Sequence, residues 1–184
     1  MERSKYNDHF TKFPYRKEVR DDDINNGGID LVKEPHRISE IHELNGALWL
    51  KNFIINTNSD GKFFMSFGCV QGSEDDGSIV GYVDLSLRPG SPIEYRPDIK
   101  VMDELFIQYL RDSMISREME NPQQAIEYAQ SVLVWEWTPL EIYGETYEKF
   151  CVTFQTLEIE GVVWVFDHLD YFLNQYYPSL KSSV

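Results

Sequence analysis

Cysteine, basic residues and long hydrophobic runs are all scarce in this sequence. It has two cysteines, Cys69 and Cys151, and no apolar stretch that approaches roughly 18 residues. A disulfide framework needs more cysteines, and a zinc site needs ligands at short spacing. Both cysteines lie in apolar stretches, so we expect buried free thiols. Without a membrane span or an apolar signal segment, a reducing, cytoplasmic environment is expected.

The shortage of basic residues bears on which partners the chain can attract. The chain has 17 Lys and Arg against 31 Asp and Glu, a formal net charge of −14. Nucleic acids and anionic membranes both attract basic surfaces, so neither is expected as a partner. The charge is uneven, because residues 1–20 carry six bases and three acids, whereas residues 118–184 carry two bases and eleven acids. A basic arm therefore precedes an acidic body.

Cofactor and catalytic motifs are also missing. The sequence has no GxGxxG, GxxxxGK[ST], HExxH or CxxC pattern, and no cofactor is expected. Two weaker candidates for acid–base chemistry remain. Glu136 lies between Trp135 and Trp137, a pattern that also fits a half-buried strand, and His168 follows Asp167, which also fits the start of a helix. The sequence therefore favours a protein without enzymatic activity over an enzyme.

Acidic and oxygen-rich stretches raise the question of a metal site. Residues 56–61 resemble the front of a calcium loop, but the twelfth position is Phe67 instead of a bidentate glutamate. The triplets at residues 21–23 and 74–76 are dense in acids, but neighbouring acids in an extended loop point in different directions. We therefore assign no metal ligands, and we interpret residues 56–61 as a hairpin turn.

Length and pattern predict one α+β domain preceded by an arm. Residues 1–37 are predicted as an irregular arm, basic and then acidic, which Phe10, Phe13 and Tyr15 attach to the body. Residues 38–184 are predicted as a single α+β domain, since one core serves a chain of 184 residues.

The predicted domain consists of an antiparallel β-meander and a C-terminal β-hairpin packed with two to three helices. The meander strands are expected at residues 47–56, 62–70 and 79–87, and the hairpin strands at residues 149–157 and 162–166. Helices are expected over residues 98–118, from Asn121-Pro122 onward, and from an Asp167 cap to Tyr177, with a short one over residues 38–44.

The most distinctive functional feature is the combination of acids and tyrosines. Such a surface is typical of protein recognition, and electrostatic steering speeds the capture of a basic partner. The predicted partner-binding residues are Glu74, Asp75, Asp76, Asp167, Asp170, Tyr171, Tyr176 and Tyr177. We therefore predict an acidic protein-binding module, specifically an inhibitor of the immunity or antitoxin type that neutralises a basic toxin such as a nuclease.

Two alternatives belong to other classes. One is a small carboxylate-dependent hydrolase that uses Glu136, or Asp167 with His168, in a cleft. The other is an accessory or assembly protein that forms a homo-oligomer, for example a homodimer, through its aromatic strands. A pocket with two converging acids would favour the hydrolase, and a flat acidic surface with tyrosines would favour the inhibitor.

Overall fold

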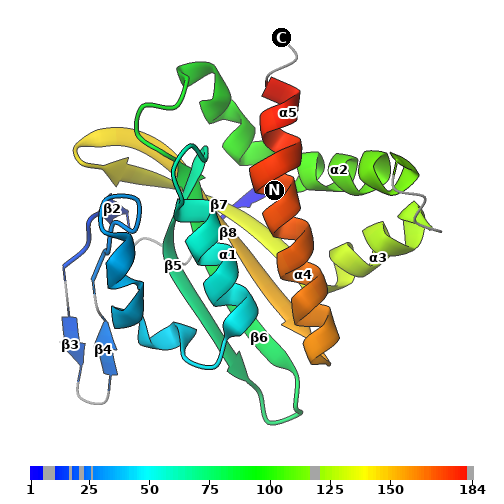
Figure 1. Cartoon of the computed structure of the whole chain (residues 1–184), viewed down its shortest axis with the longest axis horizontal. Coiled ribbons are helices and arrows are strands. Elements are labelled where there is room, and N and C mark those ends of the chain that lie inside the picture. Colours follow the sequence, from blue (N-terminus) through cyan, green and yellow to red (C-terminus); the bar gives the residue numbers. More distant parts are fainter. Residues whose placement is uncertain (6–10, 17, 21–22, 26, 117–120, 182–184) are drawn as a thin grey trace.

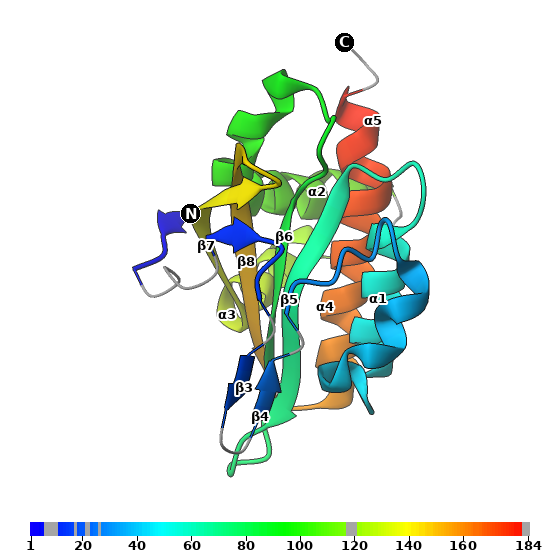
Figure 2. The ribbon, with the colours of Figure 1, turned by 90° about the vertical axis from the view of Figure 1, so that its left-hand side faces the viewer.

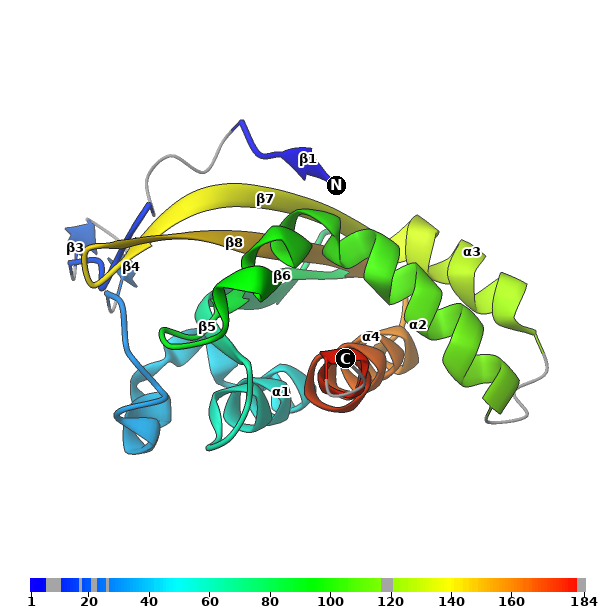
Figure 3. The same ribbon diagram turned by 90° about the horizontal axis from the view of Figure 1, so that it is seen from above.

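A curved mixed sheet organises the chain in the computed structural model, which describes residues 1–5, 11–16, 18–20, 23–25, 27–116 and 121–181. The strand order is β1-β7-β8-β6-β5 (Figures 1 and 3). Its long strands are β5 (Phe64–Ser73), β6 (Ile79–Leu87), β7 (Leu133–Ile142) and β8 (Glu145–Thr156). The short strands β1 (Glu2–Arg3) and β2 (Lys12–Phe13) pair in parallel with β7, and β3 (Glu18–Arg20) pairs with β4 (Asp23–Asn25).

The helices lie on one side of this sheet, and β1 continues the sheet beyond β7 at its edge (Figures 2 and 3). The α-helices are α1 (Leu48–Asn58), α2 (Met102–Ser116), α3 (Pro122–Val132), α4 (Ile159–Tyr171) and α5 (Tyr177–Lys181). A π-helical turn, η5 (Phe172–Tyr176), joins α4 to α5. The 3-10 helices are η2 (Pro35–Glu40), η3 (His42–Leu44) and η4 (Ile93–Val101). The α+β class is therefore confirmed.

The main core lies between the sheet and α1, α4 and α2. Phe150, Val152 and Phe154 alternate along β8 and point to the helices, as the two-residue period of a strand requires. The ring of Phe154 packs against that of Phe166 on α4, with centroids 5.2 Å apart. Trp135 stacks on Phe150 at 5.9 Å. Much of the aromatic content of the chain is thus used inside the domain.

Two segments predicted as strands are helices. Residues 48–56 belong to α1, whose buried residues Leu50, Phe53, Ile54 and Thr57 have helical spacing. Residues 56–61 therefore form the end of this helix and the turn that follows it, and not a hairpin turn. β-branched and aromatic residues favour strands only weakly, and burial of an apolar helix face outweighs that preference.

The second segment that was wrongly predicted as a strand is the expected second strand of the C-terminal hairpin. Residues 162–166 lie in α4, and Asp167 lies inside that helix instead of capping a new one. The hairpin partner of β8 is β7, which the sequence left unassigned. The turn between them is Tyr143-Gly144, whose φ angles of 52° and 89° fit a two-residue hairpin turn with both residues in the left-handed region.

Other elements agree with the sequence. The third predicted strand coincides with β6 (Ile79–Leu87), and the second overlaps β5. The start of α3 is also as predicted, because Asn121 caps the helix and Pro122 occupies its first turn. The predicted helix over residues 98–118 contains α2, which follows the 3-10 helix η4.

Replacing Asn121 with alanine will lower the free energy of unfolding by about 1 kcal/mol, because its side-chain oxygen accepts a hydrogen bond from the Gln124 amide at 3.2 Å. Urea unfolding followed by circular dichroism measures this loss. The matched control is Gln123→Ala, an exposed position in the first turn. An equal loss in both variants would show that the cap does not stabilise α3.

Residues 11–16 of the arm pack on the sheet face that the helices leave uncovered, whereas Ile29 and Leu31 near its end belong to the main core. Phe13 is 3% exposed and lies in a small cluster with Met65, Phe67, Leu140 and Tyr147. Its ring contacts Phe67 edge-on, with centroids 4.9 Å apart. The predicted anchor Phe10 and the acids Asp21 and Asp22 lie outside the described residues. Phe13 thus attaches the arm to the domain.

Candidate protein-binding site

The first predicted acidic segment is the turn between β5 and β6. Glu74, Asp75 and Asp76 are all exposed there. Hydrogen bonds from the Ser78 hydroxyl and amide lower the pKa of Asp76, and the amide lies 2.8 Å from its carboxylate. The turn lies at the same end of the molecule as the start of α4, far from α5 (Figure 1). Its acids therefore do not share one patch with Tyr176.

The predicted C-terminal residues have different environments. Asp167 is exposed, whereas Asp170 accepts hydrogen bonds from Asn56 at 2.6 Å and from Asn174 at 3.0 Å. Tyr177 is 0% exposed, and its hydroxyl donates to Asp98 at 2.7 Å. The prediction that Tyr177 lies on a binding surface is therefore wrong. It is a core residue, because α5 turns this side chain toward the sheet.

The remaining tyrosines belong to a row of half-buried rings along α4, which we call the aromatic row. The row consists of Tyr128, Trp164, His168, Tyr171 and Tyr176. Trp164, His168 and Tyr171 repeat at i, i+4 and i+7, so they share one face of α4. Trp164 lies 4.9 Å from Tyr128 on α3 and 4.3 Å from His168. Tyr128, Trp164 and His168 thus form one continuous strip, which Tyr171 and Tyr176 extend along α4 and η5.

Tyr109 on α2 supports the centre of this strip. It is 1% exposed, stacks on Tyr171 at 5.8 Å and contacts Tyr176 at 5.3 Å. Its hydroxyl lies 2.9 Å from Nδ1 of His168. These contacts hold the outer rings in place, so little side-chain entropy would be lost when a partner binds them. The sequence did not indicate Trp164 as a surface ring and suggested His168 only for acid–base chemistry, because their segment was predicted as a strand and a helix start.

Acidic groups accompany the aromatic row. Tyr176 donates its hydroxyl hydrogen to Asp112 at 2.7 Å, and burial together with Asp112 raises the pKa of Tyr176. Glu160 and Asp167 are exposed on α4, and neither has an ion-pair partner in the part of the chain that the structure describes. The helical surface therefore combines fixed aromatic rings with free negative charge.

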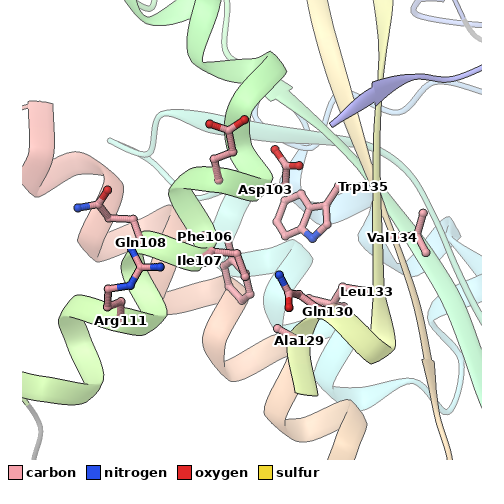
Figure 4. A pocket seen from close by; sticks show the side chains of 11 residues that line it. Asp103, Phe106, Ile107, Gln108, Arg111, Ala129, Gln130, Leu133, Val134 and Trp135 are labelled. Atoms are coloured by element: carbon pink, nitrogen blue, oxygen red, sulfur yellow. The ribbon is translucent and has the colours of Figure 1, made fainter. Parts of the chain in front are cut away.

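A separate groove of about 670 Å³ lies between α2, α3 and the start of β7 (Figure 4). Its floor is apolar and contains Phe106, Leu133 and Trp135. Carboxylates of Asp103 and Glu104 line one end of the α2 wall, and Arg111 lines the same wall seven residues beyond Glu104. We call this feature the α2–α3 groove.

The residues considered for acid–base chemistry do not converge. Glu136 lies opposite Cys151, on the sheet face away from the helices, whereas Asp167 and His168 lie on α4. The sheet therefore separates the two candidate sets. Trp135 and Trp137 point away from Glu136, as the predicted strand requires, and the Nδ1 atom of His168 pairs with Tyr109.

The two cysteines are free and half-buried. Burial, with Glu43 and Asp84 nearby, raises the pKa of Cys69 to about 12. Burial and the neighbouring Asp84 carboxylate also raise the pKa of Cys151. Both thiols therefore stay protonated at neutral pH, and neither supplies a thiolate nucleophile.

Comparisons with known proteins do not assign the site. No family model, curated protein or solved structure matches the chain at a significant level. Among the residues that the structure describes, no three His, Cys, Asp or Glu side chains are arranged to hold a metal ion. No helix in the described part combines the length and hydropathy needed to cross a membrane.

Proposed function

We propose that this chain is an acidic protein-binding module that captures a basic partner, in the role of an immunity- or antitoxin-type inhibitor of a toxin such as a nuclease. The observation that supports the proposal is the aromatic row with Glu160 and Asp167 beside it. Aromatic rings supply contact area at low entropy cost, and free carboxylates steer a cationic partner and pair with its side chains.

The charge distribution of the chain also favours a positively charged partner. The chain carries −14, and ion pairs within it neutralise bases such as Lys12 with Glu141 at 3.2 Å and Lys100 with Glu148 at 2.6 Å. Glu160 and Asp167 keep their charge available. The exposed turn acids Glu74 and Asp75 add to the field and stay predicted as steering charges that act on the association rate.

The binding test begins with affinity capture from the source cells and continues with association kinetics of the purified basic partner. Trp164→Ala will weaken the complex by about tenfold or more, as expected for a central aromatic anchor. The double variant Glu160→Gln with Asp167→Asn will slow association about threefold, and added salt will reduce the difference.

The matched control is Asp60→Asn with Glu94→Gln, which removes the same charge from two exposed positions outside α4. It separates a local effect of the aromatic row from an effect of net charge. Three results contradict the proposal: capture that returns no basic protein, binding that is insensitive to salt, or equal rates for the two double variants. Inhibition of the partner's own activity by the captured complex tests the inhibitor role.

A further inference from the structure

We infer that the α2–α3 groove binds an extended peptide segment with an apolar side chain at its centre, a lysine or arginine toward Glu104 and a carboxylate toward Arg111. The inference rests on the proposed function only in that the segment belongs to a protein partner. The groove and the aromatic row lie on different faces of α2, because Phe106 and Ile107 line the groove whereas Tyr109 supports the row.

Size and lining fit an apolar side chain better than a purely polar ligand. The volume of about 670 Å³ lies within the usual range for ligand sites, roughly 300–1,000 Å³. Phe106 and Leu133 are buried at the floor, and Val134 at the edge is 61% exposed. A bound segment would therefore remove apolar surface from water. Tryptophan and arginine, both present here as Trp135 and Arg111, are the residues that most often anchor protein interfaces.

The charges at the two ends of the α2 wall have opposite signs. Glu104, Gln108 and Arg111 repeat at i, i+4 and i+7, so they share one face of α2. The two turns between Glu104 and Arg111 separate them by about 10 Å along the axis. Side chains of an extended segment alternate between its two faces, and the segment rises about 3.3 Å per residue. A base and an acid four positions apart therefore share one face at about 13 Å, with the apolar side chain midway between them, and the long side chains of Glu104 and Arg111 span the remaining difference.

No residue in the described part of the chain neutralises Glu104 or Arg111 at the two ends of the groove. Glu104 and Arg111 are exposed and have no ion-pair partner among the described residues. Asp103 pairs through one oxygen with the Met1 ammonium group at 2.9 Å, while its other oxygen is buried and has no donor. The acidic end therefore keeps a surplus of negative charge for a cationic side chain.

Three capped pentapeptides test this polarity: acetyl-Lys-Ala-Leu-Ala-Glu-amide, and versions in which both end residues are lysine or both are glutamate. Binding is followed by the NMR signal of the Trp135 indole, assigned with Trp135→Phe. The wild-type chain will bind the Lys/Glu peptide about fivefold more tightly than either like-charged peptide, as two exposed ion pairs allow. Replacing its leucine with glycine will abolish measurable binding.

Charge reversal of one end supplies the decisive control. Arg111→Glu makes both ends acidic, so the dilysine peptide will become the preferred ligand. Lys5→Glu makes the same change in net charge at an exposed position outside the groove and will leave the order of the peptides unchanged. The inference is overturned if no peptide shifts the Trp135 signal or if the two variants alter the order equally. Capture of a basic partner through the aromatic row, measured separately, would survive that failure.

Discussion

Replacing Lys149 with alanine will lower the free energy of unfolding by about 3–5 kcal/mol. The Lys149 ammonium lies 2.6 Å from Asp84, and the two side chains are 1% and 4% exposed. The pair joins neighbouring strands β6 and β8 on the sheet face opposite the helices. Removing the ammonium leaves the Asp84 carboxylate buried without its counter-charge, and one of its oxygens already lacks a hydrogen-bond donor.

Urea unfolding at pH 7 measures this loss, and a double variant separates its causes. Lys149→Met with Asp84→Leu removes both charges, so it will lose much less stability than Lys149→Ala alone. Lys100→Ala is the matched control, because Lys100 is 44% exposed in its pair with Glu148, and it will cost at most about 1 kcal/mol. Similar losses for Lys149→Ala and Lys100→Ala would contradict this account of the buried pair.

Replacing Phe13 with alanine will detach residues 11–16 of the arm from the sheet at a cost of about 3 kcal/mol. Phe13 fills the small core cluster under the arm, and its ring touches Tyr15 and Tyr143 as well as Phe67. The expected effect is local, because the main core lies on the opposite face of the sheet. Residues 11–16 should separate from the sheet while the rest of the domain stays folded.

Hydrogen exchange locates this opening. The amides of Glu141 and Tyr143 donate to the carbonyls of Thr11 and Phe13 at 2.7 and 3.1 Å, so both will exchange about 100-fold faster in Phe13→Ala. The Val152 amide in the central strand β8 will keep its protection. Leu157→Ala, at a position that is 81% exposed, is the control and should change neither. Uniform acceleration across the sheet would contradict a locally attached arm.

Local sequence signals predicted the elements whose pattern has a single interpretation. Alternation placed β6 at its bounds, and the Asn121-Pro122 pair marked the start of α3, because capping and fixed proline geometry act within one turn. The same approach failed for α1 and α4. Their short apolar runs fit either a buried strand or a buried helix, and only the surface against which they pack decides between the two.

The candidate site was predictable to a similar extent. Tyr171, Tyr176 and Asp167 were selected from composition, and the structure places them on or beside the aromatic row. Tyr177 was selected by the same argument and is buried, because adjacent positions on a helix point about 100° apart. Trp164 became visible as a surface ring only once α4 was known to be a helix. The α2–α3 groove had no signal at all, since the angle at which its two helices pack is not encoded in any local pattern.

The sequence by itself determined the acidity of this chain, the position of the basic arm and the α+β class. These properties follow from composition and short-range pattern, which do not depend on how the segments meet. The tertiary structure decided that the acidic body has a fixed row of rings on α4, that Lys149 pairs with Asp84 inside the protein, and that a charged groove opens beside Trp135. Each of these features joins residues from different elements, so packing alone creates it.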